Sequence, residues 1–128
     1  MEKCGRITES EWQVMEVIWE KEMGMTQPEL MYKLGNRWNK NTVHTFLKRL
    51  CEKGVLAVEK EETPHRYRAL IDRESCVKEE RQSFVERVYQ GSVGRMVASF
   101  VRDGKLSGKE VAELRKLLDE LDELEVKE

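Results

Sequence analysis

The apolar residues of this chain change their spacing at Gly54, and that change separates a helix from a hairpin. In NKNTVHTFLKRLCEKG, residues 39–54, the apolar side chains recur at the three- and four-residue intervals of one helix face. Directly afterwards, LAVE (56–59) and HRYRAL (65–70) alternate between apolar and polar positions, and the EETP between them has the composition of a turn. The sequence therefore predicts a helix followed at once by a two-stranded β-hairpin.

Two further helices are predicted before this point from their capping signals. TESE (8–11) is a capping box that begins a helix running to the break at Gly24, and TQPE (26–29) begins a second helix that ends near Gly35. Asn39 is suited to cap the third helix. Three helices and a hairpin, with a short turn before the third helix, are the order of a winged helix-turn-helix.

Beyond Asp72 the helical pattern resumes and is interrupted at Gly91-Ser92 and at Asp103-Gly104. The apolar residues of the last segment step by three, four and three, as in a coiled-coil seam. Short helices with such stripes need a partner surface. We therefore expect a mainly α chain of two domains: an α+β winged helix-turn-helix at residues 1–72, and a helical domain at residues 73–128.

The side of the third helix opposite its apolar stripe carries short hydrogen-bonding groups and cations. In a winged helix-turn-helix this helix enters a DNA major groove, where Asn suits adenine and the Thr methyl group suits thymine. The residues predicted to meet base edges are Asn41, Thr42, His44 and Thr45. Those predicted to meet phosphates are Lys48 and Arg49, together with Arg66 and Arg68 of a basic hairpin tip that also holds Lys60 and His65. The expected partner is double-stranded DNA.

Charge is distributed unevenly along the chain, although the whole carries a net charge of only -2. Residues 36–73 hold nine Lys and Arg against five Asp and Glu, whereas residues 74–128 hold ten against thirteen. A polyanion would favour the first segment. No run approaches the roughly 18 apolar residues of a membrane span, and the N-terminus lacks the apolar segment of a secretory signal. We therefore expect no membrane insertion and a cytoplasmic protein.

Other interpretations of these residues stay open. The polar side of the third helix could be an ordinary solvated face, and the chain could be a winged-helix interaction module without sequence-specific DNA binding. An enzyme is not expected, because no phosphate loop, carboxylate pair or Cys/His set has a workable spacing. The three cysteines, Cys4, Cys51 and Cys76, match neither a disulfide framework nor a zinc site, so we expect no metal or cofactor.

The chain resembles the penicillinase repressor family (BlaI/MecI/CopY) along nearly its whole length. ITESEWQVMEVIWEK resembles the acidic-Trp signature of the family's first helix. NTVHTFLKRLCEKG resembles its recognition-helix pattern Lys-Thr-Ile/Val-x-Thr-x-x-x-Arg-Leu-x-x-Lys-Gly, and the matching residues are Thr42, Val43, Thr45, Arg49, Leu50, Lys53 and Gly54. Two positions depart from it, since His44 stands where Arg is frequent and Asn41 where Lys is common.

The resemblance implies a homodimeric transcriptional repressor that acts at pseudo-palindromic operators, with an N-terminal DNA-binding domain and a C-terminal dimerisation domain. The residues expected to form the dimer are the apolar positions of the last two helices: Val97, Phe100, Val101, Val111, Leu114, Leu118 and Leu121. The copper-responsive branch has paired cysteines near its C-terminus, and LRKLLDELDELEVKE has none, so copper sensing is not expected.

In the β-lactam-responsive branch of the family, a membrane sensor triggers proteolysis at an Asn-Phe bond of the dimerisation domain. This bond lines up with Ser99-Phe100 in MVASFVRDG. The resemblance thus offers Ser99-Phe100 as a cleavage site in a sensor-protease pathway, and the alternative is an ordinary helix with a buried Phe. A small-molecule effector and redox control through Cys51 also remain as alternatives.

Overall fold

The computed structural model describes residues 6–126, and their side chains as far as Leu124. Its first compact unit ends at Ser83 and its second begins at Phe84. The first unit contains the elements α1 (Glu9–Ile18), β1 (Met25–Thr26), α2 (Gln27–Leu34), α3 (Lys40–Glu52), β2 (Leu56–Glu59) and β3 (Arg66–Ala69). The helix α4 (Arg73–Tyr89) begins in this unit, and α5 (Val93–Arg102) and α6 (Gly108–Val126) belong to the second.

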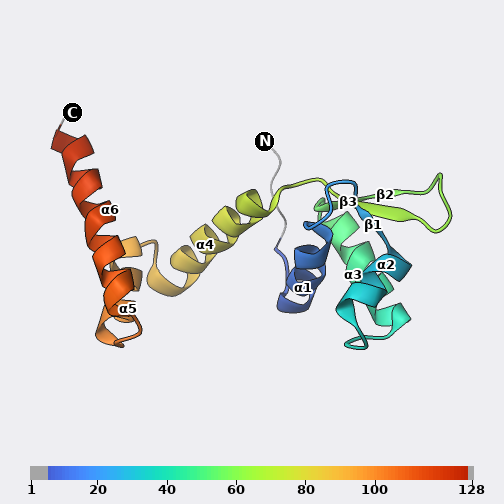
Figure 1. Cartoon of the computed structure of the whole chain (residues 1–128), viewed down its shortest axis with the longest axis horizontal. Helices are drawn as coiled ribbons and strands as arrows, with labels where there is room; N and C mark the ends of the chain where they lie inside the picture. Colours follow the sequence, from blue (N-terminus) through green and yellow to red (C-terminus); the bar gives the residue numbers. More distant parts are fainter. Residues whose placement is uncertain (1–5, 127–128) are drawn as a thin grey trace. The chain divides into compact units, whose positions relative to one another are not determined.

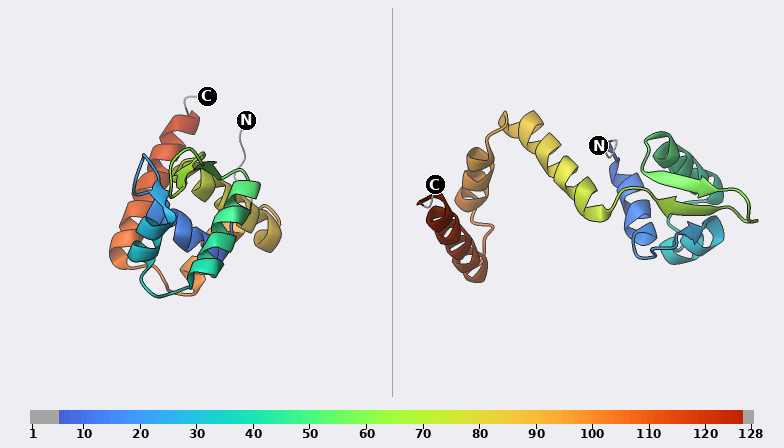
Figure 2. Two further views of the ribbon diagram at one scale, coloured as in Figure 1. Left: turned by 90° about the vertical axis from the view of Figure 1, so that its right-hand side faces the viewer. Right: turned by 90° about the horizontal axis from the view of Figure 1, so that it is seen from above.

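In the first unit, three helices gather beside a small sheet from which the β2–β3 loop projects (Figures 1 and 2). The sheet has three strands in the order β1-β3-β2, all antiparallel. The two-stranded hairpin is confirmed, with Val58 opposite Tyr67. The sequence prediction did not include the third strand, β1, which pairs Met25 with Tyr67. A two-residue strand is too short to show the alternation by which strands are recognised.

Capping fixes the helix starts where the sequence placed them, whereas α1 ends at Ile18, well before the predicted end at Gly24. The Thr8 side chain accepts a hydrogen bond from the Glu11 backbone N–H, and the Glu11 carboxylate accepts one from the backbone N–H of Thr8. Thr26 and Glu29 repeat this arrangement at α2. Asn39 Oδ1 accepts from the Thr42 backbone N–H at 2.8 Å, and this bond begins α3. These caps satisfy backbone donors that the first helical turn leaves unpaired.

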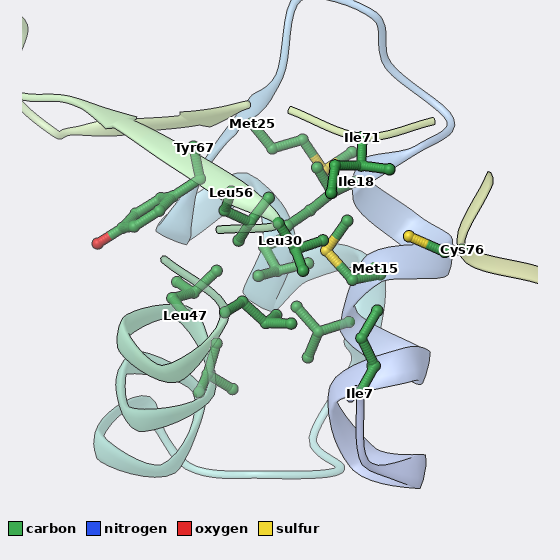
Figure 3. Packing of buried hydrophobic residues seen from close by; sticks show 14 residues of the cluster. Ile7, Met15, Ile18, Met25, Leu30, Leu47, Leu56, Tyr67, Ile71 and Cys76 are labelled. Carbon is green, nitrogen blue, oxygen red and sulfur yellow. The ribbon is translucent and has the colours of Figure 1, made fainter. Parts of the chain in front are cut away.

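The core of the first unit lies between the three helices and the sheet (Figure 3). Its fully buried residues come from all of these elements and include Met15, Ile18, Leu30, Leu47 and Leu56. Each such side chain contributes about 1.5–3 kcal/mol relative to an exposed one. The apolar stripe of α3 therefore faces this core, which leaves its opposite side to solvent.

The tryptophans are packing residues. Trp12 and Trp19 form an edge-to-face pair with ring centroids 5.4 Å apart, and Trp38 pairs with Phe46 at 5.1 Å. Trp19 Nε1 also donates to the carbonyl of Ile71 at 3.0 Å, just before α4 begins.

Gly24 allows β1 and β3 to approach each other closely. Its φ of 86° lies in the left-handed region, and a Cβ there would overlap the carbonyl oxygen of Tyr67. Any larger residue would therefore push β1 away from β3.

The second unit consists of the end of α4 with α5 and α6. The Tyr89 and Ser99 hydroxyls are 2.9 Å apart, and Phe84 packs edge-to-face on Tyr89.

The predicted boundary at residues 72 and 73 coincides with the start of α4, whereas the compact units divide within α4. Arg73 lies in the first unit, where its guanidinium pairs with Glu16 of α1 through bonds of 2.7 and 3.2 Å. The domain boundary at 72 stays a prediction.

Candidate nucleic-acid interface

The outward side of α3 is the surface on which the predicted base-edge residues lie. Asn41, His44 and Thr45 are exposed on it, while Thr42 is half-buried at its margin. At 100° per residue, Asn41 and Thr45 share the centre of this side with Lys48, and His44 lies on one flank. Val43, Leu47 and Leu50 are fully buried on the opposite side. The core thus orients this polar surface outward.

Hydrogen bonds within α3 decide which groups of these residues remain available. Thr45 Oγ1 donates to the backbone carbonyl of Asn41 at 3.0 Å, so its proton is engaged, and the methyl group and the hydroxyl lone pairs remain for a partner. Within the part of the chain that the structure describes, no hydrogen bond occupies the side chains of Asn41 and His44. An unoccupied Asn amide can both donate to and accept from a base edge.

The four predicted phosphate contacts fall into two classes. Lys48 and Arg49 are exposed on α3 and have no ion-pair partner among residues 6–126. Arg68 is paired with Glu59, with Nε and Oε1 3.6 Å apart. The guanidinium of Arg66 is half-buried, where it donates to the carbonyl of Gly24 at 3.3 Å and lies 3.7 Å from a Glu62 oxygen. The cations of α3 are therefore available to phosphates, whereas those of β3 are already engaged.

A buried ion pair connects the C-terminus of α3 to the N-terminus of α1. The carboxylate of Glu11 is fully buried and accepts from the Lys53 ammonium as well as from the backbone of Thr8. Burial opposes ionisation of Glu11, but the Lys53 and Thr8 hydrogen bonds outweigh it, so the pKa of this carboxyl is lowered. From its sequence context, Glu11 is predicted only to complete a capping box. The pair fixes the end of α3 and hence the direction of its outward side.

A hollow lies between α2, α3 and the loop of the hairpin. Its volume is about 500 Å³, and His44 of α3 and His65 of the loop both line it. Lys40 lines it too, and the Gln27 side chain donates to the Lys40 carbonyl at 2.9 Å, which connects α2 to α3. Lys40 is not among the predicted site residues, although its position directly after the helix cap places it at the N-terminus of α3.

The cysteines offer little chemistry. Burial raises the pKa of the half-buried Cys51 thiol, which disfavours the reactive thiolate. Cys76 is buried, and Cys4 lies outside the described residues. Among residues 6–126 no cluster of His, Cys, Asp and Glu is placed to hold a metal ion. Nor is any helix in that range both long and apolar enough to cross a bilayer.

The predicted dimer residues lie on apolar sides of α5 and α6. Phe100 is 46% exposed and Val101 56%, while Leu118 is 59% exposed on α6. Val97 and Leu121 are also exposed, whereas Val111 and Leu114 are half-buried. Leu117 and Leu124, which the seam pattern omitted, widen the apolar side of α6 with exposures of 59% and 62%. Apolar surface of this extent marks a contact site for another molecule.

Comparison with known proteins gives consistent results. The family described as Penicillinase repressor matches residues 7–120. The chain is 34% identical over 122 residues to the penicillinase repressor of Bacillus licheniformis, with 94% of each chain covered. It is 28% identical over 118 residues to the methicillin resistance regulatory protein MecI of Mammaliicoccus sciuri, covering 91% of this chain and 96% of that protein.

A solved structure extends the comparison to the fold. The solution structure of the DNA binding domain of the repressor BlaI matches with a TM-score of 0.51 and 32% identity. The match covers 59% of this chain and 93% of that one. The predicted winged helix-turn-helix is thereby confirmed.

Proposed function

The chain belongs to the penicillinase repressor family, whose members are DNA-binding repressors and not enzymes, and we propose that it represses transcription as an operator-bound dimer. Two copies form a homodimer through α5 and α6. The dimer binds a pseudo-palindromic operator, with each α3 in a major groove and each hairpin beside the adjacent backbone. Bound in this way, the protein blocks transcription of the gene that the operator controls.

The observation that carries this proposal is the outward side of α3. It combines the Asn41 amide, the His44 imidazole and the Thr45 methyl group with the cations Lys48 and Arg49, which have no ion-pair partner among residues 6–126. The short groups suit base edges, which specify the sequence, and the cations suit phosphates, which position the protein on the duplex.

The exposed apolar sides of α5 and α6 support the homodimer. A two-fold axis places identical surfaces against each other, so one self-complementary apolar patch is sufficient. A dimer also joins two recognition helices, and each helix alone reads only a few base pairs. Dimer formation and operator binding are then thermodynamically linked.

Fluorescence anisotropy tests the proposal. The full chain is titrated with a duplex from its own upstream region and with a scrambled duplex, at two salt concentrations. We expect tighter binding of the upstream duplex, two chains per site, and weaker binding at higher salt because phosphate contacts release counterions. Failure on both duplexes, with a dimer confirmed separately, would favour the protein-interaction module instead.

We further propose that proteolysis at Ser99-Phe100 ends repression after a β-lactam or cell-envelope signal relayed by a membrane sensor. The bond lies inside α5, so the helix must open locally before a protease can reach it. The Ser99 hydroxyl donates to the carbonyl of Met96 at 2.7 Å and contacts Tyr89, which holds this turn closed. Cleavage would separate α6 from most of the apolar side of α5 and so weaken the dimer.

Mass spectrometry of induced cells examines this step. A fragment that begins at Phe100 is expected, and Tyr89→Phe should speed its appearance because the Tyr89–Ser99 contact is lost. Only intact chain, found while the controlled gene is transcribed, would contradict cleavage without touching the operator proposal. A fragment that begins at Phe100 would also exclude the alternative that Ser99-Phe100 is an ordinary, uncleaved part of a helix.

A further inference from the structure

The hollow between α2, α3 and the hairpin loop has the size of a small-molecule site. Its volume of about 500 Å³ lies within the usual range of such pockets, roughly 300–1,000 Å³. All of its lining residues belong to the first compact unit, so it is formed by one chain alone.

Much of the wall of this hollow is apolar. Pro28 and Met31 of α2 line it, as do Pro64 of the hairpin loop and Tyr67 of β3. Tyr67 itself is nearly buried, and its hydroxyl is directed away from the core cluster (Figure 3). DNA phosphates need cations or hydrogen-bond donors, which Pro and Met side chains do not supply. Such a wall suits an apolar, flat body instead.

The polar groups of the hollow favour an anion. Lys40 contributes an ammonium, and the imidazoles of His44 and His65 can each donate a hydrogen bond. No Asp or Glu is among the described residues that line it. A ligand with an aromatic body and one carboxylate or sulfonate group would therefore match both the wall and the charge.

We propose that this hollow binds small anionic aromatic molecules, and that such a ligand and operator DNA exclude each other. The exclusion rests on the proposed function, because His44 is there a base-edge residue and the hairpin loop lies beside the DNA. A molecule seated between α3 and the loop occupies space that the DNA backbone crosses. A ligand that binds only the DNA-free protein lowers the apparent operator affinity by mass action.

Dye binding to the full chain tests the site without DNA. The probe is 8-anilinonaphthalene-1-sulfonate, with fluorescence as the readout and neutral N-phenyl-1-naphthylamine as the uncharged comparison. We expect saturable binding of the sulfonate dye at one site per chain and weaker binding of the neutral dye. Lys40→Gln should raise the dissociation constant about two- to five-fold, as for loss of one exposed ion pair.

Two further variants separate this site from other apolar surfaces. Met31→Trp fills the hollow and should abolish the saturable signal, with circular dichroism used to verify folding. Lys33→Gln removes the same charge from the exposed surface of α2, outside the hollow, and should leave dye binding unchanged. Dye bound to the exposed sides of α5 and α6 would respond to neither Lys40→Gln nor Met31→Trp, and that result would overturn the proposal.

A competition titration then tests exclusion. Upstream duplex added to the dye complex should displace the dye, and dye should raise the apparent dissociation constant for the duplex. Simultaneous binding of both would overturn the exclusion. If the duplex binds and the dye does not, the ligand site is wrong while the operator proposal stands; if the dye binds and no duplex does, the operator proposal fails instead.

Discussion

At the scale of single residues, we expect Thr45 to contact a base through its methyl group. Its hydroxyl donates its proton to the Asn41 carbonyl, so towards a base the hydroxyl can only accept. We predict that Thr45→Ala costs about 1–3 kcal/mol in binding at the operator only, whereas Thr45→Val, which keeps a methyl group, loses less. Anisotropy with operator and scrambled duplexes measures both. Equal losses on the two duplexes for Thr45→Ala would contradict a base contact.

Ionisation of Glu11 should make the free energy of unfolding fall as pH is lowered. Because its pKa is lowered in the folded state, its contribution is present above the unfolded pKa of about 4.3 and disappears as pH falls through the folded value. We predict that Glu11→Gln costs about 1–3 kcal/mol in the free energy of unfolding at pH 7, since Lys53 loses its ionised partner.

Urea unfolding followed by circular dichroism at pH 7 and at pH 3 checks this prediction. The difference in unfolding free energy between the native chain and Glu11→Gln should shrink at the lower pH. Other carboxylates with lowered pKa values, such as that of Glu16, are present in both proteins and cancel in the comparison. A difference that stays constant with pH would show that Glu11 is not ionised in the folded protein.

At the scale of elements, α3 and the hairpin should contribute unequally to phosphate binding. Lys48 of α3 is unpaired among the described residues, whereas Arg66 of β3 is held by Gly24 and by Glu62. We predict that Lys48→Ala weakens binding of all DNA and lowers the slope of log K against log salt by roughly one. Arg66→Ala should change that slope less and destabilise the fold more. Equal slopes for the two variants would contradict this ranking.

The elements also show what a sequence pattern can and cannot predict. Helix starts were predicted because a capping box is local, with both partners three residues apart, as for Thr8 and Glu11. Strand β1 was missed because two residues show no period, and Thr26 was assigned only its role as a helix cap. The fold class followed from the change of period at Gly54.

The candidate site was predictable in position but not in its internal bonds. The outward side of α3 follows from its period of apolar residues, so Asn41 and His44 were placed correctly on the surface. The engagement of Arg66 depends on Gly24, which is 42 residues away, and a spacing argument cannot reveal it. The hollow depends in the same way on contacts between distant segments.

At the scale of the whole molecule, operator binding at two half-sites requires that two copies associate. We predict that Leu118→Glu raises the dimer dissociation constant by at least about 30-fold, because it buries a charge where an apolar anchor is expected. Ala112→Glu adds the same charge on the opposite side of α6 and should leave the dimer intact. Sedimentation equilibrium distinguishes the two variants. If both dissociate alike, α6 does not supply the interface.

The proposed repressor must recognise its operator as a two-fold dimer, and hydroxyl-radical footprinting of the upstream DNA is the measurement to make first. Two equivalent recognition helices should protect two patches whose centres lie about one or two helical turns apart, roughly 10 or 20 base pairs. Leu118→Glu should lose both patches together, while Ala112→Glu should retain them. A single protected patch, or none under conditions where binding is established, would contradict operator recognition by a two-fold dimer.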